Sequence, residues 1–344
     1  MKQIFSFLFF VILIGGGIAA YLLLSSGTAF NEKSKFFIIE EGQTDKASVT
    51  EMLQKKEIIN QGLLFSTLGS AIGVWEKIKP GKYEVKKGDN LLSIARMLKN
   101  GKQAQINLVI NKLRTKEDFA KLVSKSFAID SISVMSYLNN NDSLKQFDVD
   151  TNTVFSIIIP DTYTFYWNTS LQRILQRLND TKNNFWSRND RKNKAAEIGF
   201  SPTEIYTLAS IIEEETNYDT DRSKIASVYI NRIAKGMPLQ ACPTIKFAMK
   251  DFTITRIYEK YLFHPSAYNT YRNKGLPPGP ICTPNPKGID LVLNAPKTDY
   301  LFFVAKANFD GYHHFSNNFA EHDRYAKEYQ KQLDIYMAKK QQTQ

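Results

Sequence analysis

The segment 201–216, SPTEIYTLASIIEEET, carries the sharpest structural signal in this chain. Ser201 suits a helix N-cap, Pro202 suits the first helical position, and Glu204 stands three residues after the cap, as in a capping box. These residues predict that a helix begins here, which sets the phase of every later side chain. At about 100° per residue, one side of the helix is apolar and holds Ile205, Leu208, Ala209, Ile212 and Thr216.

Three adjacent carboxylates end this predicted helix. Its phase predicts that Glu214 projects into solvent, whereas Glu213 and Glu215 lie at the two borders of the apolar side. A carboxyl at such a border is partly removed from water, and this raises its pKa toward the range in which it can donate a proton near neutral pH. The phase does not separate Glu213 from Glu215. A purely structural role, with the acids paired to bases such as Arg222, stays open.

The N-terminal stretch 4–24, IFSFLFFVILIGGGIAAYLLL, has 21 positions without a charged side chain. About 20 apolar residues cross a bilayer, so we predict a transmembrane anchor over 4–25. Lys2, in the stub 1–3, places the N-terminus in the cytoplasm by the positive-inside rule. A cleaved signal peptide is the competing interpretation, because residues 25–29 are small. The anchor is favoured because the run exceeds a usual signal core, and it places the remaining chain outside the cytoplasm.

The formal net charge of +11 predicts attraction to polyanions, which include nucleic acid, an anionic membrane surface and an anionic cell-wall polymer. A location outside the cytoplasm argues against nucleic acid as a partner. The same location would allow Cys242 and Cys282 to form a disulfide, although two free thiols fit the sequence equally well. No Cys/His spacing indicates a metal site, and neither a metal nor an organic cofactor is expected.

The chain of 344 residues is long enough for two or three domains. Alternating apolar residues near Tyr83, helical spacing over 91–98 and a second alternating run at 106–110 predict a β-α-β unit. Its pattern, Y-x-V-x-x-G-D-x-L-x-x-I-A, resembles a LysM module, a small sugar-binding fold; a generic βαβ packing unit is the alternative. The predicted class is α+β, with these parts: a stub at 1–3, the anchor at 4–25, a linker and first strand at 26–43, the LysM-like subdomain at 44–111, a helical connecting region at 112–195, a catalytic domain at 196–335 and a polar tail at 336–344.

Segments after residue 237 are rich in hydrogen-bonding and ring-shaped side chains. The prolines and glycines of 275–286 predict a stiff, non-helical loop. The residues YNTY at 268–271, just before it, are of types that stack on sugars and hydrogen-bond to them. A rigid loop loses less entropy when it clamps a polymer, although an ordinary ordered connection has the same composition.

Four blocks, in this order and spacing, resemble the YceG-like family of membrane-anchored endolytic murein transglycosylases: LASIIEEET, KIASVYINRIAKGMPLQACPT, SAYNTYRNKGLPPGPI and YLFFVA…HHFSNNFAEH. The resemblance runs from about residue 36 to 333, and PDTYTF at 160–165 agrees with it. It implies a lyase that cleaves MurNAc–GlcNAc bonds within peptidoglycan strands and leaves anhydro-MurNAc ends. It also implies a bacterial inner-membrane location, with the catalytic body on the periplasmic side, and peptidoglycan synthases as partners.

The family resemblance also assigns roles to individual residues. It implies that Glu213 acts as general acid and then as base, with Glu215 in support. The substrate-binding residues that it implies are Gln240, Thr244, Tyr268, Asn269, Thr270, Tyr271, His314 and Ser316. The sequence departs from the family pattern at Cys242, where an acid is frequent, and at 155–156, where Phe-Ser replaces Glu-Gly. A disulfide between Cys242 and Cys282 would be a local replacement.

Two other functions fit the same residues. A non-catalytic peptidoglycan-binding protein would use the same polar and aromatic loops, but it would release no anhydro-ended fragments. A glycoside hydrolase would pair Glu213 with a second carboxylate, either Glu215 or Asp161, and its products would gain a water.

Overall fold

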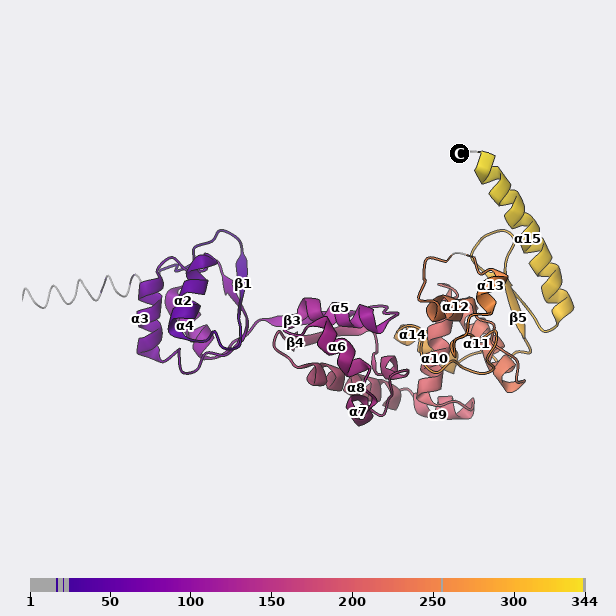
Figure 1. Ribbon diagram of the computed structural model, residues 1–344, viewed down its shortest axis with the longest axis horizontal. Helices are drawn as coiled ribbons and strands as arrows, with labels where there is room; N and C mark the ends of the chain where they lie inside the picture. Colours follow the sequence, from indigo (N-terminus) through magenta and orange to yellow (C-terminus); the bar gives the residue numbers. More distant parts are fainter. Residues whose placement is uncertain (1–16, 18–20, 22–24, 255, 343–344) are drawn as a thin grey trace, which may run out of the picture. The chain divides into compact units, whose positions relative to one another are not determined.

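The computed structural model describes residues 17, 21, 25–254 and 256–342, and the chain forms two compact units (Figure 1). The first unit comprises Met1–Leu108, Ser126–Ala128 and Thr164–Ser170; the second comprises Val109–Lys125, Ile129–Tyr163 and Leu171–Gln344. Helices and strands occur together, so the expectation of a mixed α+β fold is consistent with the structure. The finer domain limits given above stay a prediction.

The predicted membrane anchor requires a correction. Within the described ranges, no helix has both the length and the apolar character needed to cross a bilayer. The predicted span, 4–25, falls almost entirely on residues outside those ranges. The transmembrane helix in the predicted fold class and the inner-membrane location derived from it are therefore both withdrawn.

Between residues 25 and 108, the first unit is built on an antiparallel strand pair and the helices that pack on it. Strand β1 (Ser34–Ile39) pairs with β2 (Gly81–Lys86), with Ser34 opposite Lys86 and Ile39 opposite Gly81. The helices are α2 (Lys46–Lys55), α3 (Gly62–Ile72) and α4 (Leu91–Lys99). Alternate strand residues such as Phe37 and Tyr83 are fully buried against these helices, as expected for a sheet with one covered face.

The elements of the predicted β-α-β unit all form, but the two strands do not pair with each other. The strand near Tyr83 is β2, and its partner is β1. The strand over 106–110 is β3 (Gln105–Ile110), and it forms a two-stranded sheet with β4 (Asp161–Tyr166). Alternation predicts a strand but not its partner, because pairing is decided by contacts distant in sequence.

The second unit is mainly helical, and Figure 1 labels most of its helices. The α-helices before the catalytic-domain segment are α5 (Lys116–Ser126), α6 (Ser131–Leu138), α7 (Asn141–Leu144), α8 (Leu171–Ser187) and α9 (Arg191–Glu197). Two short 3-10 helices lie at Lys145–Phe147 and Val154–Ile157. The later helices are α10 (Pro202–Glu213), α11 (Asp219–Ala234), α12 (Cys242–Ala248), α13 (Glu259–Leu262), α14 (Pro286–Leu293) and α15 (Phe319–Gln342).

Helix α10 packs against α9, α11 and α14 in the second unit. It begins at the residue that the sequence predicts. The Ser201 hydroxyl accepts from the Glu204 backbone, and the Glu204 carboxylate accepts from the Ser201 backbone, so the capping box is complete. Every residue from Ile205 to Ile212 is buried, because α9, α11 and α14 contact α10 on several sides. The expectation of a single apolar side is therefore wrong: a helix surrounded by others is buried all round.

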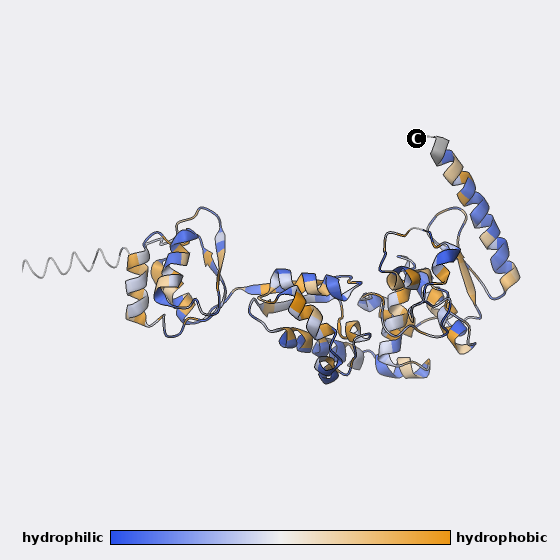
Figure 2. Cartoon of the chain, viewed as in Figure 1, coloured by the Kyte–Doolittle hydropathy of each residue, from blue (hydrophilic) through white to orange (hydrophobic). Residues whose placement is uncertain are grey.

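The C-terminal part contains a second antiparallel pair. Strand β5 (Phe302–Ala305) pairs with β6 (His313–Ser316), with Phe302 opposite Ser316. Helix α15 packs on both strands with its N-terminal part. Figure 2 shows α15 largely in the hydrophilic colour, in keeping with its exposed outer face.

Candidate functional site

Glu213 is the last residue of α10, and its side chain lines a cavity of about 380 Å³. The side chain is 12% exposed, so the carboxyl is largely covered by protein while it reaches the cavity. The cavity walls come from the end of β3, the start of β4 and the proline loop. Its lining residues are Val109, Ile110, Asn111, Lys112, Pro160, Asp161, Thr162, Glu213, Thr283, Asn285 and Pro286.

Two neighbours hold the Glu213 carboxyl. Nη2 of Arg222 lies 3.3 Å from Oε1, and Nδ2 of Asn285 donates to Oε2 over 2.6 Å. Asn285 is itself fixed, because it is the N-cap of α14 and its Oδ1 accepts from the Gly288 backbone N–H over 2.7 Å. A β-carbon placed on Gly288 would lie 3.3 Å from Oε2 of Glu213. These contacts hold the Glu213 carboxyl in one defined position.

Arg222 reaches Glu213 from the first turn of α11. It is 6% exposed, and its Nε donates to the Thr216 carbonyl over 2.9 Å. Its Nη1 lies 3.6 Å from Oδ1 of Asp219. The structural pairing with Arg222 that the sequence left open is therefore present. Glu213 still lines the cavity, and Arg222 contacts only its Oε1, while Oε2 accepts from Asn285.

Glu214 does not project into solvent, and that prediction is wrong. Its side chain is 15% exposed and accepts from Nε and Nη2 of Arg114 over 3.1 and 2.9 Å, with Nζ of Lys112 3.0 Å away. Glu214 caps α10 in a helical conformation, but the segment that carries Lys112 and Arg114 covers the face on which it lies. Burial alone would raise the pKa of Glu214, but the contacts with Arg114 and Lys112 outweigh it and lower this pKa.

Glu215 lies away from the Glu213 cavity and faces α11. The Tyr229 hydroxyl donates to its Oε1 over 2.7 Å. Burial raises the pKa of Glu215 to about 7, although the hydrogen bond from Tyr229 and the charge of Lys246 act in the opposite direction. Of the two acids that the sequence could not separate, Glu213 lines the cavity and Glu215 carries the raised pKa.

Three of the expected substrate-binding residues are buried and join two loops. Oγ1 of Thr270 lies 2.9 Å from Oγ1 of Thr244 and accepts from the Ala241 backbone over 3.0 Å. Asn269 donates to the carbonyls of Leu262 and His264. Thr244, Asn269 and Thr270 are each at most 1% exposed, so in this conformation they contact protein and hold the loops that precede the proline segment.

The other expected residues are dispersed. Gln240 is exposed and accepts from Arg232, whereas Tyr271 lies 3.1 Å from Cys242. Tyr268 packs its ring at 4.8 Å from that of Phe247 and lines a different cavity. On β6, the His314 ring stacks on Tyr325, and Ser316 is 2% exposed. None of the eight lines the Glu213 cavity.

Both cysteines are free thiols, so the disulfide suggested by the family comparison does not form. Sγ of Cys242 lies 3.1 Å from the Tyr271 hydroxyl. Sγ of Cys282 donates to the Ser210 carbonyl in the core over 3.3 Å. Each thiol therefore has its own polar neighbour, and burial raises the pKa of both.

Asn285 and Gly288 were missed by the sequence reasoning, although one signal was available. The order Asn285-Pro286 places a good N-cap before a proline at the first helical position, which predicts the start of α14. Nothing in that pattern indicates that the cap also reaches Glu213. A buried pair, Asp221 and His313, was also missed; Nδ1 of His313 lies 2.8 Å from the Asp221 carboxylate and fixes β6 to α11.

Comparisons with known proteins identify the family of this chain. The model of the YceG-like family matches residues 37–328. A Bacillus subtilis (strain 168) protein named endolytic murein transglycosylase is 30% identical over 305 residues, which cover 82% of this chain and 81% of that protein. A protein of the same name from Streptococcus pneumoniae serotype 2 is 24% identical, over 95% of this chain and 65% of its own length. The crystal structure of a yceG-like protein from Listeria monocytogenes aligns with a TM-score of 0.56 and 26% identity, over 86% of this chain and 99% of that one. The chain therefore belongs to the YceG-like family.

Proposed function

We propose that this protein is a peptidoglycan lytic transglycosylase that cleaves MurNAc–GlcNAc bonds within glycan strands, with Glu213 as the catalytic residue. The observation that carries the proposal is the position of Glu213: its carboxyl faces a cavity of about 380 Å³ and is held there by Asn285 and Arg222. The relatives named endolytic murein transglycosylase support the reaction class.

The proposed reaction needs one carboxyl with two successive roles. Glu213 first gives its proton to the glycosidic oxygen, and the bond between that oxygen and C1 of MurNAc breaks. The carboxylate then takes the proton from the C6 hydroxyl of the same MurNAc, whose oxygen bonds to C1 and closes the anhydro ring. No water is consumed. General acid–base help of this kind contributes about 100- to 10,000-fold in rate, and fixed positioning of the strand supplies the rest.

The direct test is digestion of purified sacculi by the wild type and by Glu213→Gln, with the products analysed by mass spectrometry. Wild type should release anhydro-ended fragments, and Glu213→Gln should lose at least about 100-fold in rate. Glu197→Gln, at an exposed position at the end of α9, is the matched control and should cleave normally. A wild type that binds sacculi but releases nothing would instead support a non-catalytic binding protein.

One observation favours a second candidate, the two-carboxylate hydrolase: Asp161 lines the same cavity as Glu213. A hydrolase would need Asp161 to activate water or to attack the sugar. Asp161→Asn would then abolish cleavage, and wild-type products would carry an added water. Under the proposed transglycosylase mechanism, Asp161→Asn cleaves at a rate within a few-fold of wild type and the products keep the anhydro end. Association with peptidoglycan synthases stays a prediction from the family resemblance.

A further inference from the structure

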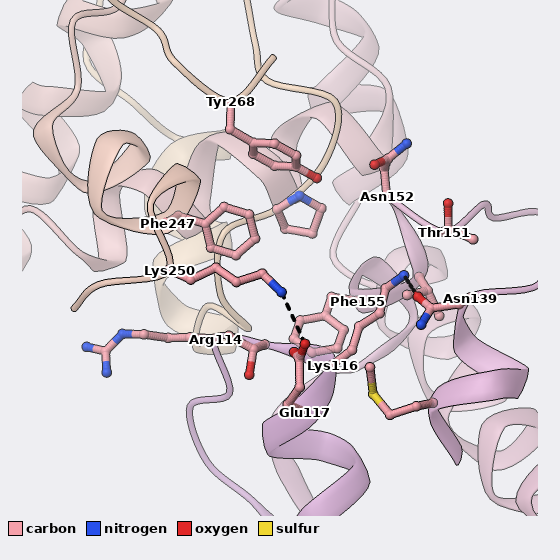
Figure 3. A pocket seen from close by; sticks show the side chains of 14 residues that line it. Arg114, Lys116, Glu117, Asn139, Thr151, Asn152, Phe155, Phe247, Lys250 and Tyr268 are labelled. Atoms are coloured by element: carbon pink, nitrogen blue, oxygen red, sulfur yellow. Dashed lines mark hydrogen bonds and ion pairs between the residues drawn. The ribbon is translucent and has the colours of Figure 1, made fainter. Parts of the chain in front are cut away.

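The second unit contains another cavity, of about 270 Å³, whose lining does not include Glu213. Figure 3 shows the charged side chains Lys116, Glu117 and Lys250 beside the rings of Phe155 and Phe247, with Tyr268 above Phe247. Helix α5 supplies the lysine at 116, and the end of α12 supplies the phenylalanine at 247. The cavity is therefore amphipathic, with charged groups and aromatic carbon side by side in its lining.

This second cavity and the Glu213 cavity share two walls. Residues 109–112 line the Glu213 cavity, and residues 114–117 line the second one. The proline loop contributes Thr283 to the first and Pro280 to the second. The two walls are hydrogen-bonded to each other, because the Leu113 backbone N–H donates to Oγ1 of Thr283 over 2.9 Å and the Thr283 N–H donates to the Leu113 carbonyl over 2.8 Å. The two cavities are therefore neighbours along the same two chain segments, with the buried pair of Leu113 and Thr283 between them.

Among the described residues, Lys116 is the cation of this cavity for which no ion pair forms, although the charges of Glu117 and Asp150 act on it. Its Nζ donates to the Leu138 carbonyl over 3.1 Å and to Oδ1 of Asn139 over 2.8 Å, and both acceptors are neutral. Lys250 differs, because its Nζ lies 3.1 Å from a carboxylate oxygen of Glu117. Burial lowers the pKa of Lys116, which shows that its ammonium is partly dehydrated. An ammonium has three N–H donors, so Lys116 can donate one further hydrogen bond. A carboxylate is the acceptor that best offsets its lost hydration.

The aromatic wall is suited to small apolar groups. Phe155 is 5% exposed. The ring centroids of Phe247 and Tyr268 lie 4.8 Å apart at a tilt of 47°, so these two rings pack against each other. Such a wall offers ring edges and aliphatic carbon rather than an open flat face for a sugar ring. Methyl groups next to a carboxylate fit this combination of a cation and a closed aromatic wall.

We propose that this cavity binds the peptide stem of murein, with a stem carboxylate against Lys116 and the small apolar side chains of the stem against Phe155 and Phe247. Murein stems are short peptides that combine carboxylates with methyl side chains, and they are attached to the sugar strand itself. The assignment rests on the proposed function, because only a protein that holds the strand at Glu213 would bring a stem to the neighbouring cavity.

The kinetic test compares strands that carry stems with strands from which an amidase has removed them. For Lys116→Met, KM on stem-bearing strands should rise about 10-fold or more, as expected for the loss of a charge-assisted hydrogen bond, while kcat and the kinetics on stem-free strands stay at wild-type values. Lys116→Arg should restore most of the affinity. Thr151→Trp, which places a large ring at the rim of the cavity, should raise the same KM. Lys192→Met, at an exposed position on α9, is the matched control and should behave as wild type.

Two outcomes would overturn the proposal: an unchanged KM on stem-bearing strands in both Lys116→Met and Thr151→Trp, or an equal loss on stem-free strands, which would mark a structural role at the end of α6. A calorimetric titration of a free murein tetrapeptide into the full chain decides the matter without catalysis. Binding that is at least about 10-fold weaker in Lys116→Met supports the stem site. If the wild type cleaves neither polymer, the proposed reaction fails, and the titration still accepts or rejects this cavity.

Discussion

The side-chain amide of Asn285 donates from Nδ2 to Oε2 of Glu213 over 2.6 Å, while Oδ1 of the same amide accepts from the Gly288 backbone N–H. One side chain thus begins α14 and fixes the carboxyl at the end of α10. The two roles use different atoms, so they can be separated by substitution.

Asn285→Asp keeps an oxygen that can cap α14 but replaces the amide donor with a second carboxylate. We expect kcat to fall about 10-fold or more, because Glu213 loses a hydrogen bond and gains a like charge beside it. KM and the melting temperature should change little. Asn285→Ala loses both roles and should also lower the free energy of unfolding by about 1 kcal/mol, the usual value of an N-cap. Unfolding curves and initial rates check both, and an unchanged kcat in Asn285→Asp would remove the positioning role.

Gly288→Ala should separate stability from activity. The backbone of Gly288 lies in the first turn of α14, where alanine favours the helix by up to about 1 kcal/mol. Its β-carbon would lie 3.3 Å from Oε2 of Glu213, closer than ordinary van der Waals contact, so the carboxyl must shift by a few tenths of an ångström. We expect an equal or higher melting temperature together with a kcat several-fold lower. A variant that is both as stable and as active as the wild type would show that the carboxyl position is not critical.

The three adjacent acids should respond differently to neutralisation. Glu213→Gln should lose activity, whereas Glu214→Gln should stay active, because Glu214 binds Lys112 and Arg114 instead of lining the cavity. The cost of Glu214→Gln falls on stability: the loss of a largely covered ion pair should lower the free energy of unfolding by about 1–3 kcal/mol. Urea unfolding and the rate of anhydro-end release measure the two effects separately. Loss of activity in a folded Glu214→Gln would contradict this division of roles.

Glu215 predicts a pH dependence of stability. Burial raises the pKa of Glu215 to about 7 in the folded protein, from 4.5 for an unperturbed glutamate. Between these values the folded state keeps a proton that the unfolded state has released, so the free energy of unfolding falls as pH rises through this window, by up to about 3 kcal/mol. Glu215→Gln retains an acceptor for Tyr229 but cannot ionise, so its stability should not show this fall. Urea unfolding at pH 5 and pH 8 tests the difference. Parallel changes in wild type and variant would contradict the raised pKa.

The start of α10 could be predicted because Ser201, Pro202 and Glu204 act on their immediate neighbours. The end of the same helix could not. The phase of the helix holds at Glu214, but the segment with the cations at 112 and 114 covers the face that the phase predicted to be in solvent. Capping is local chemistry, whereas the exposure of a residue at a helix end depends on tertiary contacts.

The loop residues show the same limit in another form. Their types indicated sugar contacts, but Thr244 and Thr270 use their hydroxyls to bind each other and the Ala241 backbone. A buried loop must satisfy its own polar groups, and threonine and asparagine do this as readily as they bind a ligand. Composition therefore identified the proline loop, which supplies part of the Glu213 cavity, but it did not identify the side chains that line that cavity.

The link between Thr283 and Leu113 also bears on the order in which the molecule assembles. The two residues are 170 positions apart, and closing so long a loop is among the slower and entropically more costly steps of folding. During synthesis, the residues of α10 emerge well before residue 283, so the Glu213 cavity lacks its second wall until most of the chain has been made. The cavity at Glu213 therefore closes only when segments from both ends of a long stretch of chain have come together.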